Sequence, residues 1–158
     1  MANLPFFLKT LHVLVACAFL GAGAAVAWVK VRADRSDDLR VVVWAHRHLV
    51  TADLVITIPS GVLLPLTGVW TAVEMGWSLT EPWILAGVGG WAVAGLCWLP
   101  AWRLQYRMLA LAEAALAAGT PLPPEFHRAT RWWTGLGAPS FAAALFTIGV
   151  MVFKRVPW

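Results

Sequence analysis

The sequence predicts an all-α protein, a transmembrane four-helix bundle with both termini on the extracytoplasmic side. Of its 158 residues, 60% are hydrophobic and only 13% are charged, whereas about a quarter of the residues of a soluble domain carry charge. Four stretches are long enough to cross a bilayer at about 20 residues each. They are Leu11–Val29, Leu49–Val73, Pro82–Trp102 and Trp132–Phe153. A soluble helix needs a polar face, so we expect one four-span integral membrane domain over residues 1–158 rather than a very apolar soluble core.

The first helix is expected from Pro5 to about Val31, and His12 is the strongly polar residue of its apolar run. The basic residues follow this run, whereas a cleaved signal peptide carries them before it. Residues 21–25 read Gly-Ala-Gly-Ala-Ala. Such a smooth surface suits close packing against another helix of this chain, a second copy in a homodimer, or a partner membrane protein.

The second helix begins near Leu39, after a charged loop over residues 32–38, and is unusually long. Pro59 and Pro65 lie inside it and predict kinks, because proline cannot donate a backbone hydrogen bond. In lipid, the carbonyls freed in this way need donors from nearby side chains or a neighbouring helix. The third helix runs from Pro82 past Pro100 to residue 118, and the fourth from about residue 125 to 152.

Basic residues set the predicted topology. Most fall in two loops: Lys30, Arg32, Arg35, Arg40 and Arg47 in the first, and Arg103, Arg107, Arg128 and Arg131 in the second. The opposite side holds only Lys9, Lys154 and Arg155. The excess of positive charge on cytoplasmic loops therefore places both loops in the cytoplasm. The net charge of +4 thus reflects membrane topology and predicts no nucleic-acid partner.

One face of the second helix carries a polar stripe. At about 100° per residue, its members fall within roughly 80° of one another. They are His46, Asp53, Thr57, Ser60, Thr67 and Thr71. Such a stripe faces the bundle interior, where it joins helices or lines a polar pocket. A carboxylate such as that of Asp53 needs a cation or several donors there. His48 points to the opposite side of the same helix.

The imidazole of His12 has two interpretations. A neutral ring can donate a structural hydrogen bond to a neighbouring helix, or it can ligate a haem iron, as inward-facing histidines of helix bundles do. A haem held by both His12 and His48 is strained, because the two residues enter the membrane from opposite sides. A single histidine ligand is easier to build. Motifs of common soluble enzymes (Walker A, GxGxxG, GxSxG, HExxH) do not occur.

Several short motifs in order along the chain resemble a family of uncharacterised bacterial integral membrane proteins, domain of unknown function 2269. They are Leu8-Lys9-Thr10-Leu11-His12, Arg47-His48-Leu49-Val50-Thr51-Ala52-Asp53, Pro65-Leu66-Thr67-Gly68-Val69-Trp70, Trp98-Leu99-Pro100 with Gln105, and Val150-Met151-Val152-Phe153-Lys154. The layout is also similar to membrane-type protoporphyrinogen oxidase and copper-resistance membrane domains. These resemblances imply a bacterial inner-membrane location and handling of haem, porphyrin or metal at His12. His48, and not His46, lies in the matching motif.

Three functions stay open at this point. The first is a membrane redox protein, a possible oxidoreductase, that binds haem b and passes electrons between a quinone or porphyrin and a partner. In it His12 is the ligand, His48 a second ligand or a contact on the propionate side, Arg47 a partner of the haem propionates, and Asp53 a group that handles protons. The second is a non-enzymatic membrane subunit or scaffold whose polar residues lock the bundle. The third is a small metal or solute permease.

Overall fold

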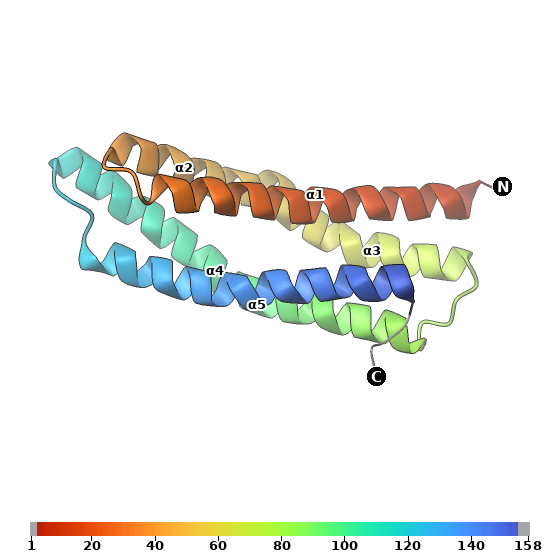
Figure 1. The fold of residues 1–158 in the computed structure, drawn as a ribbon. Coiled ribbons are helices and arrows are strands. Elements are labelled where there is room, and N and C mark those ends of the chain that lie inside the picture. Colours follow the sequence, from red (N-terminus) through yellow and green to blue (C-terminus); the bar gives the residue numbers. More distant parts are fainter. Residues whose placement is uncertain (1–2, 155–158) are drawn as a thin grey trace.

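The computed structural model describes residues 3–154, and all its regular elements are helices (Figure 1). They are α1 (Leu4–Ala33), α2 (Leu39–Ala52), the π-helical turn η1 (Asp53–Thr57), α3 (Ile58–Glu74), α4 (Pro82–Ala118) and α5 (Pro124–Phe153). Because α2, η1 and α3 follow one another without a break, the chain forms four rods. All four are long and apolar enough to cross a membrane. The predicted all-helical, four-span architecture is confirmed.

The two charged loops lie at the same end of the molecule. Figure 1 shows residues 34–38 and 119–123 together at one end, with the start of α1, the 75–81 connection and the end of α5 at the other. We call these the basic end and the terminal end. The basic residues of both loops therefore gather at one end, as the charge pattern predicts, whereas which side of the membrane that end faces stays a prediction. Arg155 lies outside the described residues.

The helix limits follow from local chemistry. Asp38 caps α2, where its Oδ1 accepts a hydrogen bond from the backbone N–H of Arg40 at 2.8 Å, as N-cap carboxylates do. Proline stands at the first position of α4 and of α5, where its missing N–H costs nothing. Gly119 ends α4 with a left-handed φ of 64°, a conformation that glycine adopts without strain.

The two prolines of the second rod have different structural consequences. Pro59 lies just beyond η1, and the wider turn there gives room to a ring that would otherwise clash with the preceding turn. Pro65 removes the usual donor to the carbonyl of Gly61, four residues earlier. The indole N–H of Trp91 on α4 donates to that carbonyl at 3.1 Å. A neighbouring helix thus supplies the donor that the sequence requires.

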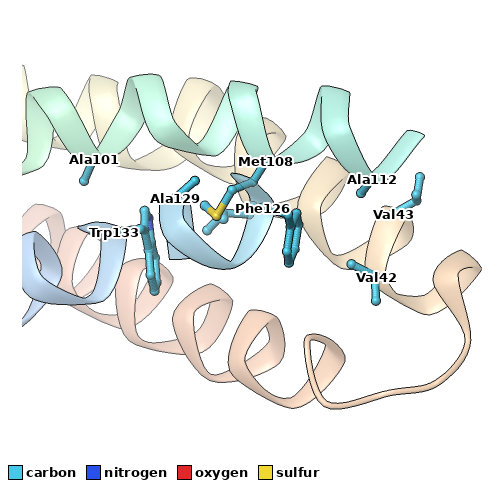
Figure 2. Packing of buried hydrophobic residues seen from close by; sticks show 9 residues of the cluster. Val42, Val43, Ala101, Met108, Ala112, Phe126, Ala129 and Trp133 are labelled. Atoms are coloured by element: carbon cyan, nitrogen blue, oxygen red, sulfur yellow. The ribbon is translucent and has the colours of Figure 1, made fainter. Parts of the chain in front are cut away.

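The hydrophobic core cluster lies at the basic end. Figure 2 shows side chains of α2, α4 and α5 that meet there around Met108 and Phe126, which are 0% and 1% exposed. Towards the terminal end, α4 and α5 approach closely through small residues, and the hydroxyl of Ser140 donates to the carbonyl of Ala94 at 2.9 Å. In contrast, Gly21 and Gly23 of α1 have no neighbour that an added Cβ would meet within 4 Å. The small-residue surface of α1 therefore does not pack within this chain at these glycines.

Candidate functional site

The polar stripe of the second rod faces the interior of the bundle. Every residue predicted for it is buried: His46, Asp53, Thr57, Ser60, Thr67 and Thr71. Four of them recur at seven-residue intervals, which separate consecutive members by about 10 Å along a helix. Among residues 3–154, the buried polar residues from other rods are Lys30 and Gln105. Polar groups therefore lie inside the bundle at several levels, from the basic end towards the terminal end.

At the basic end, a lysine, an aspartate and a histidine form a connected cluster. Lys30 Nζ lies 2.6 Å from Asp34 Oδ2, and His46 Nε2 lies 2.9 Å from Asp34 Oδ1. The lysine and histidine side chains are 0% exposed, whereas the aspartate is 13% exposed. Asp34 thus lies between two fully buried basic side chains, and its own side chain is partly exposed although Oδ2 is buried.

The ammonium group of Lys30 joins α1 to α5. It donates to the hydroxyl of Thr130 at 3.3 Å and lies 4.7 Å from the centre of the Trp133 ring. An ammonium over an indole face is attracted by the ring quadrupole. The Thr130 hydroxyl in turn donates to the sulfur of Met108 on α4 at 3.3 Å. Three rods therefore meet around one buried cation.

The charges of this cluster fix the protonation state of its carboxyl. Burial alone raises the pKa of Asp34, but the hydrogen bond from His46 and the charge of Lys30 outweigh it, so the pKa lies below its ordinary value. The carboxylate therefore accepts a hydrogen bond from His46 and forms an ion pair with Lys30, and His46 Nε2 carries a proton. His46 Nδ1 is buried and has no hydrogen-bond partner among residues 3–154. In neutral imidazole, this nitrogen is a proton acceptor.

A second polar level lies two helical turns further along the stripe, where η1 begins. Asp53 is 2% exposed, and the side chains of Thr57, Gln105 and Trp98 lie within interaction range of its carboxyl. The carboxyl Oδ2, the Thr57 hydroxyl, Gln105 Oε1 and the Trp102 indole N–H are all buried without a hydrogen-bond partner among the described residues. Each such group costs about 1–3 kcal/mol when left unpaired. The polar atoms at this level therefore need hydrogen-bond partners from outside the described chain.

A third polar level contains His12 and lies towards the terminal end. His12 Nδ1 is 2.8 Å from the Thr67 hydroxyl, whose own proton goes to the carbonyl of Leu63 at 2.7 Å. In the tautomer with the proton on Nδ1, the hydroxyl accepts from the ring, and Nε2 of a neutral His12 has a lone pair. An added Cβ on Gly68 would lie 3.1 Å from the ring. The glycine thus gives the imidazole its room.

His48 and Arg47 lie far from His12. The exposed His48 Nδ1 is 2.8 Å from the carbonyl of Trp44, and Arg47 Nη2 forms an exposed ion pair with Glu113 at 2.6 Å. Nineteen residues separate His48 from Thr67, the partner of His12, which is about 28 Å along a helix. The predicted ligand and propionate residues are therefore not brought together. His46, and not His48, is the histidine that faces the bundle.

Sequence reasoning missed the roles of Lys30, Asp34 and Gln105. The first two were assigned only to a charged cytoplasmic segment, and Gln105 only to a motif. Lys30 and Asp34 are four residues apart, a spacing that allows two side chains of a helix to pair. This spacing was the one feature of the sequence that indicated their contact. Among residues 3–154, no group of three or more His, Cys, Asp or Glu side chains could hold a metal ion.

Comparison with known proteins adds a family to this geometry. Residues 6–155 match the model of the family described as "Predicted integral membrane protein (DUF2269)". The chain belongs to this family. The match covers all three polar levels of the DUF2269 chain, as well as its four rods. No curated protein and no solved structure matches the chain. The family description thus agrees with a multi-pass membrane protein and names no activity.

Proposed function

We propose that this DUF2269 protein relays protons between its basic end and the interior of the bundle. The observation that carries the proposal is the burial of the whole polar stripe, with ionisable side chains at successive levels. Ionisable residues within a membrane are expensive, and they commonly mark ion pathways and proton relays. A stripe that only joined helices would not need them.

In the relay, protons enter at Asp34 and His46 and are held inside the bundle at Asp53. Asp34 is partly exposed and hydrogen-bonds to His46, whose second ring nitrogen is buried and accepts a proton when the ring is neutral. Asp53 lies seven residues further along, about 10 Å. Water has to bridge this interval, and the unpartnered polar atoms around Asp53 are suitable partners for it. The Thr57 and Ser60 hydroxyls continue the polar surface beyond Asp53.

The test is an infrared difference spectrum of the purified protein between two pH values. The expected result is a carboxyl band that follows pH, disappears in Asp53→Asn and remains in Glu113→Gln, which removes an exposed carboxylate instead. Replacing His46 by phenylalanine is expected to slow the change without abolishing it, because water then has to replace the ring. A wild-type spectrum with no band attributable to Asp53 would overturn the proposal.

A second candidate function is haem binding at His12, and it could use the same protons. The observation in its favour is the Nδ1–Thr67 hydrogen bond, because metal-bound histidines use one nitrogen as ligand while a neighbour orients the other. The residues fit one axial ligand to haem b, since His48 and Arg47 lie at the other end. A bound haem would supply one-electron transfer, for example with a quinone or porphyrin.

An absorption spectrum tests the haem proposal directly. Protein purified from haem-replete cells is expected to show a Soret band that His12→Ala removes and that His48→Ala leaves in place. The His48 variant is the matched control, because that ring is exposed and remote from Thr67. Folded wild-type protein that is colourless after such a preparation would exclude this candidate and leave the proton relay untouched.

A further inference from the structure

Around Asp53, the described part of the chain leaves buried polar atoms without hydrogen-bond partners. Four buried polar atoms from η1 and α4 are unpartnered there, and two of them, on Thr57 and Gln105, belong to side chains within interaction range of the Asp53 carboxyl. The three side chains are 2%, 5% and 3% exposed for Asp53, Thr57 and Gln105. Buried polar atoms in native proteins are almost always satisfied by protein, water or an ion. We therefore expect a bound water or ion at this position.

The chemistry of these atoms indicates which class of ligand they can bind. Asp53 offers a carboxylate oxygen, Gln105 an amide oxygen and Thr57 a hydroxyl oxygen. Nitrogen and sulfur ligands, which favour transition metals, are not part of this set. Oxygen ligands suit hard cations. The Trp102 indole N–H is also unpartnered, and it can donate to a water that accompanies such an ion.

The single negative charge of the Asp53 carboxylate indicates the charge of the bound ion. Among residues 3–154, the ion pairs of the buried interior involve Asp34, and none includes Asp53. One carboxylate balances a single positive charge, whereas a divalent ion would leave an uncompensated charge in a medium of low dielectric constant. A monovalent cation therefore fits and a divalent one does not.

The backbone is irregular at the same place. Asp53 begins the π-helical turn, and Pro59 follows it without an N–H to donate. A proline inside a helix leaves a carbonyl of the preceding turn without its donor. In membrane proteins, carbonyls freed at a break in a helix coordinate Na⁺ and similar ions. The π-helical turn thus puts a proline-interrupted stretch of backbone in the same short segment as the carboxylate.

We infer that Asp53, Thr57 and Gln105 bind a dehydrated monovalent cation of the sodium class, in exchange for the proton of Asp53. The inference rests on the proposed function only in that Asp53 is the shared station. Sodium and hydronium share this oxygen chemistry, and the experiment below separates them. When the ion binds, the carboxyl proton leaves to water, so charge is conserved.

The experiment measures equilibrium binding of radioactive sodium to the purified protein in detergent. We expect saturable binding of a single ion per chain, displaced by acid and by excess unlabelled Na⁺ but not by choline. Asp53→Asn is expected to abolish it. Thr57→Val keeps the charge and nearly the volume, and it should weaken binding by about tenfold, the equivalent of about 1.4 kcal/mol. Glu113→Gln, an exposed carboxylate, should bind like the wild type.

Each outcome decides between the two proposals. Size-exclusion profiles and near-ultraviolet circular dichroism establish that the variants are folded. Saturable binding that persists in folded Asp53→Asn, or no binding to the wild type at any pH above neutrality, overturns the cation site. If binding is absent while the infrared band of Asp53 still follows pH, the proton relay stands alone. If sodium binds and displaces the Asp53 proton while His46→Phe leaves the rate of the carboxyl change unaltered, the relay fails and the cation site stands.

Discussion

Replacing Asp34 by asparagine is expected to lower the free energy of unfolding by about 3–5 kcal/mol, the usual cost of breaking a buried ion pair from one side. The substitution leaves the ammonium of Lys30, which is 0% exposed, with only the Thr130 hydroxyl and the Trp133 ring. It also removes the charge that His46 contacts. Unfolding in mixed micelles of increasing denaturing-detergent fraction measures the effect.

Two controls isolate the ion pair. Asp37→Asn removes an exposed carboxylate from the same loop, and it should change stability by no more than about 0.5 kcal/mol. The double variant Lys30→Met with Asp34→Asn removes both charges and should recover most of the loss, because an apolar replacement of a whole buried pair is often neutral. If the single variant is as stable as Asp37→Asn, the cluster does not hold the basic end together.

The carboxyl of Asp34 is also expected to make the stability of the protein fall at acid pH. Its pKa is lower in the folded protein, chiefly because the hydrogen bond from His46 and the charge of Lys30 outweigh the effect of burial. The stabilisation is therefore complete above the ordinary carboxyl pKa of about 3.9 and is lost as the pH falls through the lowered value. Asp34→Asn should flatten this part of the stability curve.

Gly90→Ala is expected to lower the free energy of unfolding by about 1–3 kcal/mol, as overpacking of a close contact does. An added Cβ would meet the Thr147 hydroxyl and would lie 3.3 Å from the Ala143 carbonyl and 3.4 Å from the Phe146 ring, all on α5. The Thr147 side chain can rotate, but the backbone carbonyl cannot. The helices α4 and α5 would have to separate.

The neighbouring glycine is a matched control for this packing. Gly89 lies one residue earlier on α4, and nothing lies within 4 Å of the Cβ that alanine would add there. Gly89→Ala should therefore be neutral or stabilise the helix by up to about 1 kcal/mol, because alanine is the better helix former. The same detergent titration compares the two variants. Equal stabilities would show that α4 and α5 do not approach closely at Gly90.

The local periodicity of the sequence was sufficient to predict the rods and the stripe. A span depends on hydropathy over consecutive residues, and the direction of a helix face depends on spacing, so both are local properties. The stripe of His46, Asp53, Thr57, Ser60, Thr67 and Thr71 is buried as the helical wheel predicts. The wheel also identified His46, whereas motif resemblance favoured His48, which is exposed.

Contacts between distant segments could not be predicted in the same way. Lys30 follows an apolar span, where a basic residue normally marks the cytoplasmic side. Its burial depends on Thr130 and Trp133, about 100 residues later, and no local pattern indicates that contact. The π-helical turn was expected only as a kink, because Pro59 requires a distortion but does not specify its form. Gln105 likewise shows its role only once α4 packs beside η1.

In the proposed relay, Asp53 exchanges its proton with water through the interior of the bundle. The most direct measurement is the rate of hydrogen–deuterium exchange at its carboxyl, followed by infrared spectroscopy after mixing with deuterated buffer. The relay predicts exchange that is complete long before the backbone amides around Met108 exchange, and slower exchange in His46→Phe. A carboxyl that exchanges only as slowly as those amides would contradict it.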